Sequence, residues 1–228
     1  MSDGYTLAID GSTYEGSVAL LRESKVVAER TLKEADGAAP RAGRGEKLMP
    51  AIAECLSEAG AKRQDISRIV CGSGPGSFTS LRVAGSVAKG LAAGYGVDLY
   101  AVSSLLLTVA GAQPPLPSGE YLSVLDAMRG EFYAARIVQR QGVATQTEPP
   151  TIIPAERVAE ISAYERPLKV VGPGRQIDLR PHARGVATIL ETILNDGPVD
   201  LASWEPDYGR LAEAQVRWEA AHGRKLTT

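Results

Sequence analysis

The glycine-rich loop CGSGPGS, residues 71–77, is the stretch of this sequence whose residue types most directly predict chemistry. It follows the apolar run ISRIV and precedes a smooth apolar helical pattern, so it stands where a strand ends and a helix begins. Backbone N–H groups at such a position bind anions, and Gly72, Gly74 and Gly76 would let the backbone come close to a phosphate. Ser77 or Thr79 could cap the helix. The spacing fits neither GxxxxGK[ST] nor GxGxxG, and it modestly favours the alternative that the glycines only make a sharp turn and allow close packing.

Two other strand-end loops carry residues of the same kind. DGST places Asp10, Gly11 and Ser12 after one apolar run, and VVGPGR places Gly172 and Gly174 after another. Asp10 could also orient a metal or a water molecule, whereas the alternative for DGST is a plain hairpin turn, for which Asp-Gly is a strong signal. Each loop alone is weak support for phosphate binding, but three of them at strand ends exceed what composition gives by chance.

The sequence predicts no catalytic residue and no metal site. His182 and His222 lie far apart, no HxxxH or HExxH occurs, and Cys55 and Cys71 are isolated. Both cysteines fall in apolar patterns typical of buried, reduced thiols. The hairpin DAMRGEFY carries acidic and basic side chains, for which a solvated turn with a local salt bridge is favoured over acid–base chemistry.

The elements that would position these loops follow from the spacing of apolar residues. Strands are predicted over residues 5–10, 17–21, 26–32, 66–72 and 97–102, and helices over 46–59, 77–92 and 103–112. Pro50 would lie in the first turn of its helix or at a kink. The order βββαβαβα, three antiparallel strands followed by βα units, predicts a mixed sheet flanked by helices.

Residues 113–120, with three prolines in eight positions, are the best candidate for a linker. After them the pattern restarts with a hairpin, a short helix near 154–161, a strand at 168–172 and a helix over 183–197. The chain is therefore predicted to form two lobes, residues 1–112 and a smaller, abbreviated lobe of residues 113–228. A last amphipathic helix, residues 208–225, is interpreted as packing back on the first lobe.

Composition excludes some classes of function. The 228 residues are 44% hydrophobic and carry a net charge of −2, and the pI is about 5.8. Such a chain has no broad basic field with which to bind nucleic acid unaided, so little tRNA affinity is expected of it alone. There is no leader and no run of about 18 apolar residues, which predicts a cytoplasmic protein without a membrane span.

Several motifs, taken in order, resemble those of the bacterial TsaB family. They are AIDGST, GPGSFT followed by LR and AKGLA, DAMRGEFY, VVGPG and EPDYGR, and they span nearly the whole chain. The resemblance implies the α/β fold of actin and sugar-kinase ATPases, with two ribonuclease-H-like lobes built on mixed sheets and the second lobe truncated. The vestigial phosphate or nucleotide loops would then comprise Asp10, Gly11, Ser12, Gly74, Gly76, Ser77, Gly172 and Gly174.

The resemblance also implies a function. TsaB proteins are regarded as degenerate relatives of the transferase TsaD that lack its metal-binding HxxxH. They pair with TsaD, and the ATPase TsaE joins them, to place threonylcarbamoyl on the tRNA adenosine 3′ of the anticodon. The chain is thus expected to be a non-catalytic subunit that contacts tRNA only through the complex. For the isolated chain, a homodimer and a monomer are both open alternatives. No cofactor is expected beyond weak nucleotide binding.

Helices 46–59 and 77–92 carry more apolar positions than one buried stripe needs, which is typical of a second face kept for a partner. The resemblance places the TsaD contact on these same helices. The expected contacts are Leu48, Met49, Ile52, Leu56, Val83, Val87 and Leu91. The alternative is that the loop at residues 34–45 folds over this surface and covers it.

Three residues depart from the family pattern. Gly11 replaces a threonine and Ser80 a glycine, and both changes weaken the expectation that the loops hold nucleotide. Arg44 replaces a common histidine at the edge of the docking helix. Two other functions are alternatives. One is an ATP-dependent enzyme of the sugar-kinase or acyltransferase type, which the loops would permit. The other is a peptidase, for which the residues offer neither nucleophile nor metal ligands.

Overall fold

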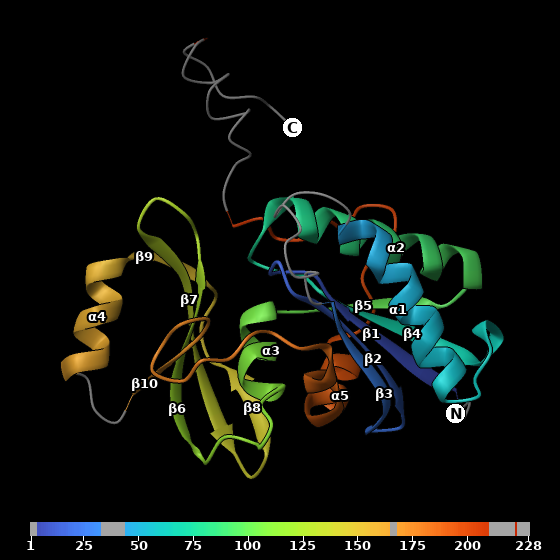
Figure 1. Cartoon of the computed structure of the whole chain (residues 1–228), viewed down its shortest axis with the longest axis horizontal. Helices are drawn as coiled ribbons and strands as arrows, with labels where there is room; N and C mark the ends of the chain where they lie inside the picture. Colours follow the sequence, from blue (N-terminus) through green and yellow to red (C-terminus); the bar gives the residue numbers. More distant parts are fainter. Residues whose placement is uncertain (1–3, 33–43, 165–167, 210–221, 223–228) are drawn as a thin grey trace.

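The computed structural model describes residues 4–32, 44–164, 168–209 and 222. Two five-stranded sheets lie side by side, with helices on their outer faces and between them (Figure 1). The α/β class with mixed sheets is therefore confirmed. Most of the predicted tail helix and of the loop proposed to cover the partner surface lies outside the described residues.

The first sheet has the strand order β3-β2-β1-β4-β5. Its strands are β1 (Tyr5–Asp10), β2 (Gly16–Arg22), β3 (Lys25–Leu32), β4 (Ile66–Gly72) and β5 (Asp98–Val102). The first three strands pair antiparallel as predicted, whereas β4 runs parallel to β1 and β5 parallel to β4. Because Ile9 pairs with Cys71, the carboxyl ends of β1 and β4 bring Asp10 and the glycine loop to the same edge of the sheet.

Helices α1 (Arg44–Glu58) and α2 (Phe78–Tyr95) cover the outer face of this sheet (Figure 1). A short 3-10 turn, η1 (Arg63–Asp65), precedes β4. α2 begins directly after the glycine loop, so that loop sits at the N-terminus of a long helix, as the sequence predicts. Pro50 lies inside α1, beyond its first turn, so the first of its two predicted positions is wrong and the kink stays a prediction.

The second sheet repeats the plan of the first in shorter form. Its strands are β6 (Gly119–Asp126), β7 (Glu131–Arg140), β8 (Val143–Gln146), β9 (Thr151–Pro154) and β10 (Lys169–Val171). The order β10-β6-β7-β8, with β10 parallel and β7 antiparallel to β6, matches β4-β1-β2-β3, and the described residues hold no counterpart of β5. Helix α4 (Ala155–Tyr164) covers the outer face. β8 and β9 were not predicted, because each has only four residues among prolines, glutamines and a glycine.

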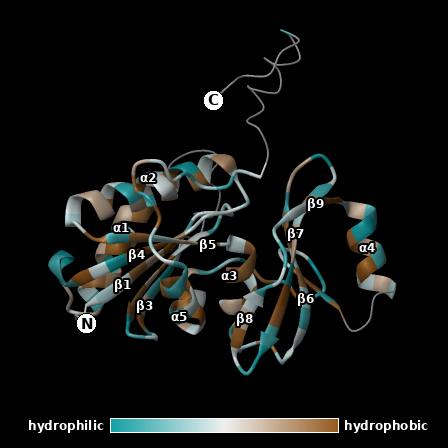
Figure 2. Cartoon of the chain, turned by 180° about the vertical axis from the view of Figure 1, so that it is seen from behind, coloured by the Kyte–Doolittle hydropathy of each residue, from teal (hydrophilic) through white to brown (hydrophobic). Residues whose placement is uncertain are grey.

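The space between the two sheets is filled by α3 (Ser104–Ala110), the 3-10 turn η2 (Ala183–Gly185) and α5 (Val186–Asp196). Apolar residues gather along the strands and on these inner helices (Figure 2). A single core cluster includes side chains of both sheets, so the division of the chain at residue 112 stays a prediction. No helix in the described part of the chain has the length and apolar character needed to cross a membrane.

Candidate functional site

Asp10, the acidic residue of the first predicted phosphate loop, is completely buried. Its Oδ1 accepts hydrogen bonds from the Ser12 N–H (3.1 Å) and the Ser12 hydroxyl (2.7 Å), and its Oδ2 accepts from the Ser104 hydroxyl (2.7 Å). Loss of solvation on burial raises the pKa of the Asp10 carboxyl, and the bonds from Ser104 and Ser12 oppose that rise. Both carboxyl oxygens are thus engaged by the protein itself.

The glycines of the loop at residues 71–77 face protein atoms at very short range. A Cβ added at Gly72 would overlap the Asp10 carboxylate, and one at Gly76 would overlap the carbonyl oxygen of Ser12. A Cβ at Gly74 would overlap the carbonyl oxygen of Asp207, from the last described segment of the chain. The geometry therefore supports the interpretation that these glycines allow close packing.

A nucleotide phosphate does not fit the residues as they are arranged. The Ser77 N–H, at the start of α2, donates to the Ser12 carbonyl oxygen at 2.7 Å, so it points into the protein. Ser77 stands at the N-cap position, but its hydroxyl makes no capping bond and lies 3.1 Å from the Ser80 hydroxyl instead. The Gly74 N–H donates to Ser104 Oγ at 3.1 Å. The DGST loop and the glycine loop lie side by side and bind each other.

Gly11 and Ser80, two of the residues that differ from the family pattern, lie next to each other. A Cβ at Gly11 would lie 2.6 Å from the Ala84 Cβ and 2.9 Å from the Ser80 carbonyl oxygen. Gly11 therefore lets the first turns of α2 approach the end of β1. Arg44 begins α1, and its side chain lies outside what the structure describes.

The third predicted loop bonds within its own segment. The Gly172 N–H donates to Ile177 O at 3.0 Å, and the Gly174 N–H donates to the Asp178 carboxylate at 2.9 Å. A Cβ at Gly172 would overlap the Val124 carbonyl oxygen of β6, so this glycine also serves close packing. The ion pair between Arg180 and Glu15, at 3.4 Å, connects the segment after this loop to the segment after DGST.

The DGST loop and the glycine loop, together called the loop cluster, bind two residues that the sequence analysis did not single out. Ser104 lies 94 positions after Asp10, and Asp207, in the EPDYGR motif, donates its backbone N–H to Ser73 O at 2.7 Å. The motif was noted only as part of the family resemblance. A proline and a glycine around a short acidic stretch could have indicated a fixed turn, but not its docking place.

The proposed partner surface on α1 and α2 is only partly available. Leu48 and Ile52 are 3% and 2% exposed, so they belong to the core, and their assignment as partner contacts is corrected. They lie with Cys55 on the stripe of α1 that faces the sheet, because residues four and seven apart share a helix face. Met49, one position away, is 46% exposed. The half-buried candidates are Leu56, Val83, Val87 and Leu91.

Among the described residues, the cysteines and the charged side chains of the β6–β7 hairpin are not arranged as a catalytic or metal site. Cys55 and Cys71 are buried and free, as predicted, and burial raises the pKa of the Cys55 thiol to about 11. Asp126 accepts the Met128 N–H at 2.7 Å across the tip of the β6–β7 hairpin. Within the described ranges, no cluster of three or more His, Cys, Asp or Glu side chains is placed to hold a metal ion.

A family model described as TsaD, tRNA N6-adenosine threonylcarbamoyltransferase, matches residues 23–175, more than half of the chain. The chain belongs to this family. Several of the curated proteins that match this chain are named TsaB. The tRNA threonylcarbamoyladenosine biosynthesis protein TsaB of Bacillus subtilis is 29% identical, with 93% of this chain and 96% of that protein aligned. The Escherichia coli protein of the same name is 34% identical over 57% of this chain and 53% of its own length.

A solved structure supports the same placement. A crystal structure from Pseudomonas aeruginosa, described as an uncharacterized protein with similarity to peptidase YeaZ, superposes with a TM-score of 0.76. It shares 27% identity and covers 91% of this chain and 100% of that one. The resemblance to the TsaB family is thereby confirmed, as is the fold that it implies.

Proposed function

We propose that this chain is a non-catalytic TsaB-type subunit that pairs with a TsaD homologue in the cytoplasm. A part in tRNA threonylcarbamoyladenosine biosynthesis accompanies membership of this family. In the proposed complex a TsaE-type ATPase joins the pair, and tRNA is contacted through the assembly. The net charge of −2 on this chain supports that arrangement, since phosphate contacts dominate affinity for nucleic acid.

The observation that carries the proposal is the open face of α2. Gly90 and Gly94 lie inside α2, both are exposed, and a Cβ on either would have no described atom within 4 Å. A glycine in a helix interior costs about 1 kcal/mol relative to alanine, and nothing within the described chain offsets that cost. Small residues allow another helix to approach the backbone closely, so this face favours a helical partner.

Apolar residues flank these glycines. Val83, Val87 and Leu91 are half-buried along α2, and the exposed Met49 stands on α1, which packs against α2. Together with Gly90 and Gly94 they define the α2 face, the surface proposed to bind TsaD. A pairing of two related chains would bury such a face on each.

The loop cluster supports the non-catalytic part of the proposal. The Asp10 carboxyl accepts three bonds from protein groups, and the loop glycines approach protein backbone or carboxylate instead of open space. A general base must reach its substrate within hydrogen-bond distance. Asp10 is fully buried and its carboxyl is committed to Ser12 and Ser104.

Pairing is tested by Val87→Asp on the α2 face. An unpaired carboxylate would be desolvated at the interface, so this variant is expected to lose co-purification with TsaD. Val143→Asp is the matched control, because it puts the same charge at an exposed valine of β8 on the other sheet. It should pair normally. Circular dichroism and thermal melting check that both variants fold.

A second variant keeps the test decisive if Val87→Asp fails to fold. Gly90→Gln adds bulk at a position with open space around it, so the chain should fold at least as well as wild type. Loss of pairing in folded Gly90→Gln protein supports the α2 face. Unaltered co-purification of both folded variants would refute it.

A further inference from the structure

The segment Trp204–Gly209, here called the strap, lies across α2 and the glycine loop. Lys89 donates from Nζ to the Trp204 carbonyl oxygen at 2.8 Å. The Pro206 ring is buried directly over Gly85, where an added Cβ would lie 2.8 Å from Pro206 Cγ. Gly85 thus differs from Gly90 and Gly94, because the chain itself occupies the space that its missing side chain leaves.

The strap also closes over the glycine loop. The Asp207 N–H donates to Ser73 O at 2.7 Å, and the Asp207 carbonyl oxygen stands where a Cβ of Gly74 would be. The Tyr208 ring packs on Phe78, the first residue of α2, with ring centroids 4.7 Å apart. Backbone of the same chain therefore covers the glycine loop at Ser73 and Gly74.

The far end of the strap is held by the second sheet. Tyr133 of β7 donates its hydroxyl to the Tyr208 carbonyl oxygen at 3.1 Å. Its ring lies against Gly209, where a Cβ would overlap the ring carbons. Gly209 has a φ of +67° and donates its N–H to the Asp207 carboxylate at 2.7 Å, which fixes a tight turn at this point. The strap therefore touches both sheets.

We infer that the strap is a closing device: it seals the glycine loop of the first sheet and ties that loop to the second sheet through Tyr133. The loop is already joined to α3 by the Gly74 N–H bond to Ser104 Oγ, so the strap completes a chain of contacts from β1 to β7. This inference is independent of the proposed pairing with TsaD.

The test is amide hydrogen exchange, measured by NMR on the full chain, in Tyr133→Phe. Losing the hydroxyl removes one hydrogen bond from the strap, and exchange of the Asp207 and Gly209 amides should rise about three- to tenfold. If the strap seals the loop, the Ser73 and Ser77 amides should exchange faster by a similar factor. Their own acceptors, Val102 O and Ser12 O, are untouched by the substitution.

Tyr121→Phe is the matched control. Tyr121 is also a buried tyrosine of the second sheet, and its hydroxyl donates to the Pro117 carbonyl oxygen at 2.7 Å, away from the strap. It should leave the exchange of both strap and loop amides unchanged. Faster exchange in the strap alone, or equal effects from both tyrosine variants, would overturn the inference.

A second pair of variants tests the same claim through the backbone. Gly209→Ala should open the strap, because the new Cβ meets the Tyr133 ring. Gly96→Ala imposes alanine at a nearly equal positive φ, +65°, at the other end of α2, with no described atom within 4 Å of the Cβ. Only Gly209→Ala should accelerate exchange at Ser73 and Ser77. Equal exchange in the two alanine variants would contradict the closing role.

Discussion

At the residue scale, Asp10 has a structural role. It stands at the end of β1 where a phosphate loop would use a carboxylate, yet it accepts bonds from Ser12 and Ser104 in a site without solvent. Ser104 also accepts the Gly74 N–H, so one hydroxyl joins β1, the glycine loop and α3.

Two adjacent serines, Ser103 and Ser104, allow the contribution of the Asp10 hydrogen bonds to stability to be measured. Ser104→Ala leaves one oxygen of the buried Asp10 carboxyl without its donor, and the free energy of unfolding is expected to fall by about 1–3 kcal/mol. Ser103→Ala is the control, because the Ser103 hydroxyl is buried without a partner in the described structure. It should change stability by less than about 0.5 kcal/mol. Urea denaturation gives both values, and similar losses in the two variants would argue against the role of Asp10.

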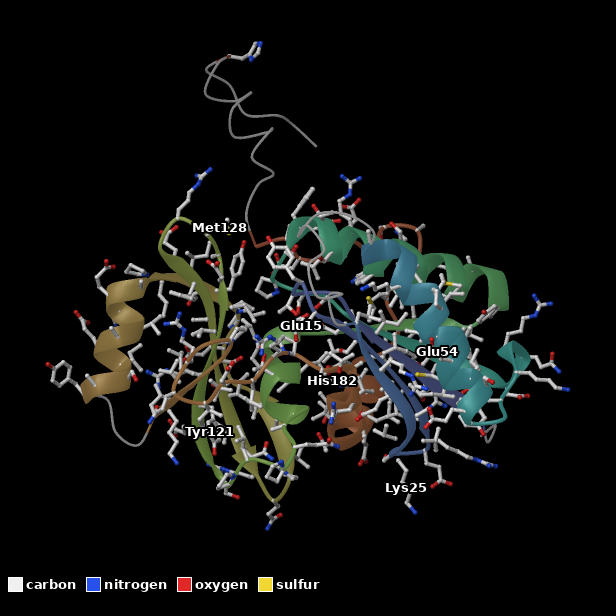
Figure 3. The ribbon with its side chains drawn as sticks, viewed as in Figure 1. Glu15, Lys25, Glu54, Tyr121, Met128 and His182 are labelled. Carbon is white, nitrogen blue, oxygen red and sulfur yellow. The ribbon has the colours of Figure 1, made fainter. Side chains whose placement is uncertain are left out.

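His182 predicts a pH dependence of stability. Its Nδ1 accepts the Arg184 N–H at 3.1 Å, its Nε2 lies 3.2 Å from Thr31 Oγ1, and the ring stands near the middle of the molecule (Figure 3). Burial, followed by the charge of Arg184, lowers the pKa of His182 to about 4. Below the ordinary pKa of about 6.5 the unfolded chain binds the proton more readily than the folded one. Stability should therefore fall by about 1–3 kcal/mol between pH 6.5 and 4.

The measurement compares wild type with His182→Asn over that pH range. The asparagine Oδ1 can accept the Arg184 N–H without gaining a proton. The difference between the two unfolding free energies isolates His182 from the carboxyl groups that titrate in the same range. The unfolding free energy of wild type minus that of the variant should decrease towards low pH. A difference that stays constant with pH would contradict the lowered pKa of His182.

At the element scale, the first sheet, α1, α2 and the β6–β7 hairpin could be predicted, because their apolar periods are regular and their ends carry glycine or turn residues. The sequence could not predict which face of α1 is buried. Leu48, Met49 and Ile52 are all apolar, and only packing against the sheet separates the exposed Met49 from its two buried neighbours. Ser104, which binds Asp10, and the strap, which covers the glycine loop, could not be predicted either, because the topology brings both from distant positions in the sequence.

Replacing a glycine of α2 by alanine should change stability in opposite directions at Gly90 and at Gly85. Gly90→Ala should stabilise the isolated chain by about 0.5–1 kcal/mol, because it improves helix propensity in open space. Gly85→Ala should destabilise it by about 1–3 kcal/mol, because the Cβ meets Pro206 of the strap. Thermal melting of the isolated chain gives both values. Stabilisation by Gly85→Ala would mean that the strap does not pack on α2.

At the scale of the whole molecule, the two sheets share a core and the outer face of the first sheet carries α1 and α2. The shared core contains residues of β1, β4, β6, β7, α3 and α5, and the strap adds a second connection at the loop edge. The loop cluster is thus closed from within, whereas the α2 face has open space beside Gly90 and Gly94. A molecule arranged in this way is suited to presenting a surface to a partner.

The central claim is tested most directly by reconstituted threonylcarbamoylation of tRNA. A TsaD homologue and a TsaE-type ATPase are supplied with threonylcarbamoyl-adenylate and tRNA, with this chain, without it, or with its Val87→Asp variant, and this chain is also assayed alone. The account predicts modification only when wild-type chain and TsaD are both present, and none from this chain alone. Modification by this chain alone, or full activity of TsaD without it, would contradict the account.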